Sequence, residues 1–184
     1  AQAVVVQTGA SPRGVPSATL AVPGLGMPIV MMSEAVPARD GDRVQLTIDA
    51  RTTRGRTQNV IAEVGPGSGP VVMAGAHLDS VPGGPGINDD GSGVATLLEV
   101  ARTFGPRPPG RVRLAFWGAE EEGLLGSTYY VTHLTAAQKA TIALNLNFDM
   151  LGSPNGRRGV YDSDDSAGSG TNPPAGSGAI EKVF

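Results

Sequence analysis

Cysteine is absent from the 184 residues of this chain, and histidine occurs only twice. The lack of cysteine excludes disulfide bonds within the chain and metal sites built on thiolates. The candidate metal ligands that remain are histidine, aspartate and glutamate side chains.

Strong net charge and long apolar runs are missing as well. The formal net charge is −3, so the sequence offers no basic surface for a nucleic acid. No apolar run approaches the roughly 20 residues of a transmembrane helix, and we expect no contact with a membrane. With 40% hydrophobic residues, the chain has the composition of a globular protein with one good core or two small ones.

The first part of the chain, residues 1–52, contains short β-type segments separated by glycine and proline. Apolar runs predict strands at Ala3–Gln7 and Pro28–Met32. Apolar and polar residues alternate from Asp40 to Ala50, which predicts a third strand with one buried face. The apolar members of this alternation are Val44, Leu46 and Ile48. Because no catalytic residue types gather here, we expect a small, β-rich accessory domain.

From residue 53 onward, predicted strands and helices alternate. Strands are predicted at residues 57–64, 70–76, 111–118 and 143–149. Helices are predicted at residues 92–104 and 126–134, and Thr135 with Gln138 forms a capping pattern for a third, short helix. This alternation predicts an α/β fold in which helices flank a mostly parallel sheet.

Side chains with metal-binding chemistry stand where three of these strands end. They are His77 and Asp79, then Glu120, Glu121 and Glu122, then Asp149, with Asp89 in the loop after the first strand. In open α/β folds, ligands bind at the carboxyl edge of the sheet, where these residues would meet. Histidine with several carboxylates suits zinc or another divalent ion, and a carboxylate can bridge two ions about 3.5–4 Å apart. Such a pair of ions favours hydrolysis.

Each of these residues also has a purely structural interpretation. His77 can be a buried structural histidine, the glutamate run can be a solvated helix start, and Asp149 can cap a turn. Their joint occurrence at predicted strand ends favours metal binding instead. Three further aspartates are interpreted as part of an acidic loop, with calcium binding as the alternative: Asp162, Asp164 and Asp165.

Three segments of the sequence together resemble a known family. They are AHLDSVPGGPGINDDGSG, FWGAEEEGLLGS and NFDMLGSPNG. Their order and spacing resemble the secreted zinc aminopeptidases of the Streptomyces type, metallopeptidase family twenty-eight of clan MH. The resemblance covers residues 57–184 and allows either Asp or Asn at position 90, so Asp90 fits it.

The resemblance implies two zinc ions, although other divalent cations can replace them. His77 and Asp149 would bind one ion and Glu121 the other, while Asp89 would bridge both. The implied reaction removes the N-terminal residue of a peptide with a free amine, by attack of a hydroxide bound to both ions.

Two more residues receive catalytic roles from the resemblance. Glu120 would be the general base that takes a proton from the attacking water. Asp79 would orient the His77 ring from outside the metal's own ligands.

The resemblance also implies a domain organisation. Residues 1–52 are similar to the later half of a protease-associated domain, and residues 53–184 to the N-terminal part of a zinc peptidase domain. The family uses a further histidine ligand downstream, which His133 cannot replace because it lies in a predicted helix. We therefore expect an internal fragment of a longer, secreted enzyme. A second chain that supplies the missing parts is the alternative.

Three other functions stay open at the level of the sequence. The chain can belong to a carboxypeptidase or a glutaminyl cyclase, to a related zinc hydrolase family, or to a docking module with a vestigial site. Replacing Glu120 with alanine separates the last from the others, because an enzyme would lose turnover while keeping its metal.

Overall fold

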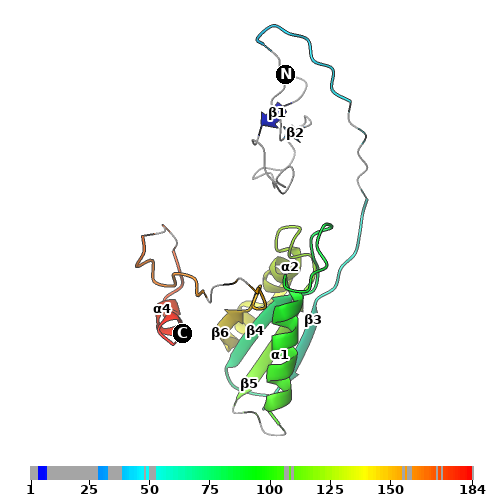
Figure 1. Cartoon of the computed structure of the whole chain (residues 1–184). Helices are drawn as coiled ribbons and strands as arrows, with labels where there is room; N and C mark the ends of the chain where they lie inside the picture. Colours follow the sequence, from blue (N-terminus) through cyan, green and yellow to red (C-terminus); the bar gives the residue numbers. More distant parts are fainter. Residues whose placement is uncertain are drawn as a thin grey trace. The chain divides into compact units, whose positions relative to one another are not determined.

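The computed structural model describes residues 4–7, 29–32, 39–47, 49, 53–105, 108, 110–154, 156, 159–168, 170 and 172–183. The chain divides into two compact units, residues 1–53 and 54–184, and each has its own sheet (Figure 1). The assignment of the first unit to a protease-associated domain stays a prediction. Among the described residues, no helix is both long and apolar enough to cross a membrane.

The first unit contains a pair of parallel strands. Strand β1, Val4–Gln7, runs beside β2, Ile29–Met32, with Val4 opposite Ile29. Both strands were predicted from their apolar runs, and the structure confirms them. Ala3 and Pro28, which the prediction included, lie outside the described residues.

The third strand predicted in this unit, Asp40–Ala50, is wrong for the residues that the structure describes there. Residues 39–47 and 49 form no strand, and the side chains of Val44 and Leu46 are 60% and 40% exposed. Ile48 lies outside the described residues. An alternating pattern supplies a possible apolar face, but a strand also needs a neighbour that pairs with its main-chain groups. No described strand pairs with this segment.

The second unit is built on a four-stranded sheet. Its strands are β3, Val60–Val64; β4, Val71–His77; β5, Arg111–Trp117; and β6, Ile142–Asn147. In the order β3-β5-β4-β6, β4 runs parallel to both of its neighbours, and β3 runs antiparallel to β5. The predicted mostly parallel sheet is confirmed, with each predicted strand placed within three residues.

Helices flank this sheet. Helix α1, Gly91–Thr103, runs along one face (Figure 1), and α2, Leu125–His133, packs on the other. The short helix α3, Ala136–Thr141, begins at the predicted capping box of Thr135 and Gln138. A further short helix, α4, covers Ser177–Glu181.

Strand β4 is the centre of the core because both of its faces are covered. On the α1 side, Ala74 and Ala76 pack with Leu97 of α1 and with two residues of β5. On the α2 side, Val71 and Met73 pack with Trp117, whose ring centroid lies 5.3 Å from that of Tyr130. A strand covered on both faces reads as a continuous apolar run, which is the pattern of this segment. The core thereby fixes the position of His77, the last residue of β4.

Candidate metal centre

The imidazole of His77 is oriented by the main chain that follows it. His77 is 4% exposed, and its Nδ1 lies 3.0 Å from the carbonyl oxygen of Asp79. Since a carbonyl can only accept a hydrogen bond, Nδ1 carries the proton, and Nε2 of the neutral ring presents a lone pair. This is the arrangement in which histidines bind metals.

Carboxylates from three separate segments surround Nε2 of His77. Asp89 Oδ1 lies 2.9 Å from it, Asp149 Oδ1 3.7 Å and Glu120 Oε2 3.8 Å. Ligand atoms of His77, Asp89 and Glu121 also lie within 4.8 Å of one another. All four predicted metal ligands and the predicted base therefore meet at the carboxyl edge of the sheet.

Register explains this convergence. His77 of β4 pairs with Trp117 of β5, and Gly75 of β4 pairs with Asn147 of β6. The three strands are parallel and end together, so the residues that follow them share one edge. The three glutamates lie in the turn between β5 and α2, where Glu121 is half-buried and Glu122 is exposed.

Two polar atoms at this edge are buried without a hydrogen-bond partner among the described residues, Nε2 of His77 and Oε1 of Glu121. Buried polar atoms in native proteins nearly always have a partner. Nε2 and Asp89 Oδ1 are both acceptors when the ring is neutral, so a contact of 2.9 Å requires a cation between them. Ligands at about 2.0–2.2 Å from a tetrahedral zinc ion are spaced about 3.3–3.6 Å apart, close to the distance from Nε2 to Asp149. These residues fit a zinc ion.

The charges at the edge shift two pKa values. Burial lowers the pKa of His77, but the negative charges of Asp149, Asp90 and Glu120 outweigh it and hold this pKa above its ordinary value of 6.5. Burial raises the pKa of Glu120, and the charge of Glu121 adds to the rise while His77 opposes it. The site therefore concentrates negative charge and favours a cation. A carboxylate with a raised pKa is also a better proton acceptor.

Asp79 contacts the site in two different ways. It orients the His77 ring through its main-chain carbonyl, because its carboxylate Oδ1 is 3.8 Å from Nδ1. The carboxylate instead accepts hydrogen bonds from the main-chain N–H groups of Glu120, at 2.9 Å, and of Glu121, at 3.1 Å. Asp79 thus holds the glutamate turn as well as the ring. The sequence does not reveal this second role.

Asp90 is the residue at this edge that sequence reasoning left without a role. It is 1% exposed, and its carboxylate accepts N–H groups from His77, Gly93 and Met150. His77, Asp90 and Asp149 also come within metal-binding distance of one another, but Asp90 is already occupied by these main-chain donors. An aspartate three residues before an N–H of the first helical turn is a typical helix cap, and this signal was present in the sequence.

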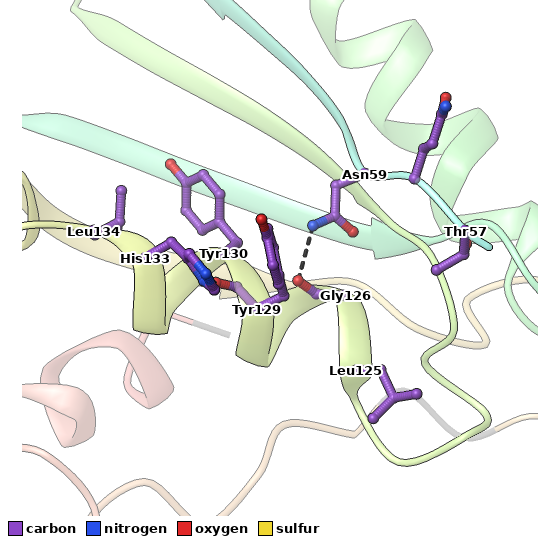
Figure 2. Close-up of a pocket in the computed structure, with 9 residues that line it drawn as sticks. Thr57, Asn59, Leu125, Gly126, Tyr129, Tyr130, His133 and Leu134 are labelled. Atoms are coloured by element: carbon purple, nitrogen blue, oxygen red, sulfur yellow. Dashed lines mark hydrogen bonds between the residues drawn. The ribbon is translucent and has the colours of Figure 1, made fainter.

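A hollow of about 690 Å³ lies elsewhere on this unit (Figure 2). The segment before β3 and the helix α2 line it, and the amide of Asn59 donates to the carbonyl oxygen of Gly126 at 2.8 Å. None of the residues around Nε2 of His77 line this hollow. His133, which does, stacks on Tyr129 at 3.8 Å between ring centroids.

Known proteins are similar to this chain over most of its second unit. An aminopeptidase of Pseudomonas aeruginosa is 49% identical over 144 residues, which are 77% of this chain and 27% of the relative. A probable lipoprotein aminopeptidase of Mycobacterium tuberculosis, LpqL, is 52% identical over 148 residues, 77% of this chain and 29% of the relative. The chain thus spans less than a third of either protein.

A solved structure and a family model also match. The structure of BSAP, a zinc aminopeptidase from Bacillus subtilis, aligns with 52% of this chain and 24% of its own, at 41% identity and a TM-score of 0.49. The family model described as "Peptidase family M28" matches residues 59–177, which is more than half of the chain. The chain belongs to peptidase family M28.

Proposed function

We propose that this chain carries the metal centre of a zinc aminopeptidase, which hydrolyses the N-terminal peptide bond of peptides with a free amine. The observation that supports it is the pair of buried, unpartnered ligand atoms, Nε2 of His77 and Oε1 of Glu121, within a ring of carboxylates. The names of the relatives from Pseudomonas aeruginosa and Mycobacterium tuberculosis support the same reaction.

In this proposal two zinc ions share the site. His77 and Asp149 hold one ion, Glu121 holds the other, and Asp89 contacts both. A further ligand for the second ion would come from outside this chain's described residues. When bound, zinc supplies a Lewis acid that polarises the scissile carbonyl and makes water a nucleophile near neutral pH.

The residues of the chain perform the remaining steps. Glu120 accepts a proton from the attacking water on a carboxylate oxygen and returns it to the leaving amine. The negative charge of Glu120 and Asp149 attracts the free α-amine of the substrate. The Asp79 carboxylate fixes Glu120 through its main-chain N–H, so the base does not need to be ordered during the reaction.

The wider setting of the enzyme is also part of the proposal. Residues 1–52 would form part of a protease-associated domain that shapes access to the site. The name of the mycobacterial lipoprotein supports action outside the cytoplasm. Peptides are the proposed partners, and a second chain that supplies missing ligands is the alternative to a longer single chain.

Substituting the base tests the reaction. In the full-length protein, Glu120→Gln is expected to lower the turnover of leucine p-nitroanilide by about 10²–10⁴-fold while the zinc content stays at that of the wild type. Glu122→Gln is the matched control, because Glu122 is the exposed neighbour of the pair, and it should keep both zinc and turnover. Wild-type protein without zinc, or Glu120→Gln with full turnover, would refute the proposal.

The choice of substrate tests the specificity. An aminopeptidase needs the free amine, so leucine p-nitroanilide should be cleaved and its N-acetylated form should not. A carboxypeptidase or glutaminyl cyclase would cleave neither, and cleavage of both forms would show that the free amine is not recognised.

A further inference from the structure

The carboxylate of Asp90 is buried at a point where three separate segments of the peptidase unit meet. Its Oδ2 accepts the main-chain N–H of His77 at 2.9 Å, from the end of β4. Its Oδ1 accepts the N–H of Gly93 at 3.0 Å, in the first turn of α1, and that of Met150 at 3.3 Å, after β6. One side chain therefore connects two strands of the sheet and the helix that covers it.

Each of these contacts lies beside a proposed metal ligand. The first donor is His77 itself, Asp89 directly precedes Asp90 in the chain, and Asp149 directly precedes Met150. A shift of the Asp90 carboxylate would therefore change the spacing of three ligands at once. Glu121 is the exception, because its main-chain N–H is held by Asp79.

A carboxylate is the side chain that suits this place. Both of its oxygens are acceptors, with about four lone-pair positions, so it can accept three N–H groups that converge from different directions. An asparagine would have to turn its own NH₂ toward at least one of these donors. The N-terminal end of α1 also favours a negative charge at its cap.

The glycine at position 93 makes the close approach possible. A Cβ there would clash with Oδ1 of Asp90 and with the main-chain carbonyl oxygen of Phe148. Only glycine allows the first turn of α1 to lie against Asp90 and the end of β6 together. The sequence thus provides space for the Asp90 carboxylate as well as the donors around it.

We propose that Asp90 is a positioning residue of the metal centre, which sets the spacing of His77, Asp89 and Asp149 without binding the metal. This inference rests on the proposed function, since it presumes that these three residues bind zinc. Residues that hold metal ligands in place typically contribute 10–100-fold to metal affinity. The same range is expected here, because removing Asp90 releases three segments at once.

Metal binding to three variants of the full-length protein tests the proposal. Asp90→Ala should weaken zinc binding by about 10–100-fold, measured by competition with a chromophoric chelator, and should change the visible absorption spectrum of the cobalt-loaded protein. Asp90→Asn keeps one acceptor oxygen and should recover part of the affinity. Thr135→Ala is the matched control, because Thr135 caps α3 and contacts none of the proposed ligands. It should lower the melting temperature but leave the zinc affinity and the cobalt spectrum unchanged.

The outcomes separate a positioning role from a helix cap. If Asp90→Ala binds zinc as tightly as the wild type, with an unchanged cobalt spectrum and a melting temperature lowered as in Thr135→Ala, Asp90 is a cap only and the inference is wrong. If Asp90→Ala does not fold, Asp90→Asn decides, and wild-type affinity in that variant overturns the inference. Failure of the wild type to bind zinc would instead refute the proposed function.

Discussion

Two clusters of acidic residues in the peptidase unit have the spacing of metal ligands, yet they differ in what their oxygen atoms already bind. At the edge of the sheet, Nε2 of His77 and Oε1 of Glu121 are buried and lack hydrogen-bond partners among the described residues. In the second cluster, formed by Asp162, Asp164 and Glu181, each carboxylate accepts a main-chain N–H group from Ser163, Ser166 or Ala167.

The comparison shows that closeness of carboxylates does not define a metal site. The second cluster is satisfied by its own loop, and a hydrogen bond from Ser166 lowers the pKa of the exposed Asp164 carboxyl. The cluster at the sheet edge is left unsatisfied by the protein, and strands β4, β5 and β6 hold it in place. A site for a cation is therefore recognised by buried acceptors that the fold leaves unpaired.

Removing the imidazole should have the largest effect on this difference. His77→Ala deletes the buried nitrogen ligand, so zinc binding at the sheet edge should fall by more than about 100-fold, as measured by isothermal titration. His133→Ala is the matched control because it removes the other histidine, which is exposed on α2. If both variants lose zinc equally, or neither does, the distinction between the two histidines is wrong.

Loosening the glutamate turn should have an intermediate effect. Asp79→Ala removes the acceptor for the N–H groups of Glu120 and Glu121, so the base and one ligand lose their fixed positions. Turnover of leucine p-nitroanilide should fall by about 10–100-fold, mainly in kcat, while KM changes little. Unchanged kcat would show that the turn keeps its shape without Asp79.

A carboxylate satisfied by cationic side chains offers a third case. Arg111 and Arg113 bind Glu63 at 2.6–2.9 Å and hold the pKa of this carboxyl below its ordinary value of 4.5. A lowered pKa in the folded state means that the ionised group stabilises the fold above pH 4.5, and that this stability is lost as the pH falls through the folded-state pKa.

Glu63→Gln tests this case through the free energy of unfolding. The difference from the wild type should be below about 1 kcal/mol at pH 7, because the ion pairs are partly exposed, and it should shrink as the pH falls below 4.5. Glu99→Gln, which removes the exposed pair with Arg102, should give a smaller difference at pH 7. A Glu63→Gln difference that stays constant down to pH 2 would contradict the assignment.

The smallest effect is expected at the second acidic cluster. The double variant of Asp162→Asn and Asp164→Asn should leave zinc content and zinc affinity at the values of the wild type. Its effect on stability should stay within about 0.5 kcal/mol, as for most surface substitutions. A loss of bound zinc in this variant would mean that satisfied, exposed carboxylates also serve as ligands in this protein.

Sequence reasoning reached the parts of the molecule that depend on local pattern. Strand β4 was predicted from its apolar run, and the meeting of His77, Asp89, Glu121 and Asp149 followed from the rule that parallel strands end at one edge. The capping box at Thr135 was likewise visible, because both of its members are three residues apart in the sequence.

The parts that sequence reasoning missed depend on contacts between distant segments. A strand was predicted at Asp40–Ala50 because alternation shows a face but not a pairing partner. The second role of Asp79 requires a turn 41 residues away, and that of Asp90 requires a loop 60 residues away. In both cases the carboxylate accepts main-chain N–H groups, and main-chain donors leave no signature in the identity of the residues that supply them.

Anomalous diffraction at the zinc absorption edge, from zinc-soaked crystals of the full-length protein, tests the central claim most directly. The account predicts peaks bounded by His77 Nε2 and the carboxylates of Asp89, Glu121 and Asp149, and none at the cluster of Asp162, Asp164 and Glu181. An empty sheet edge, or zinc bound only at the second cluster, would contradict it.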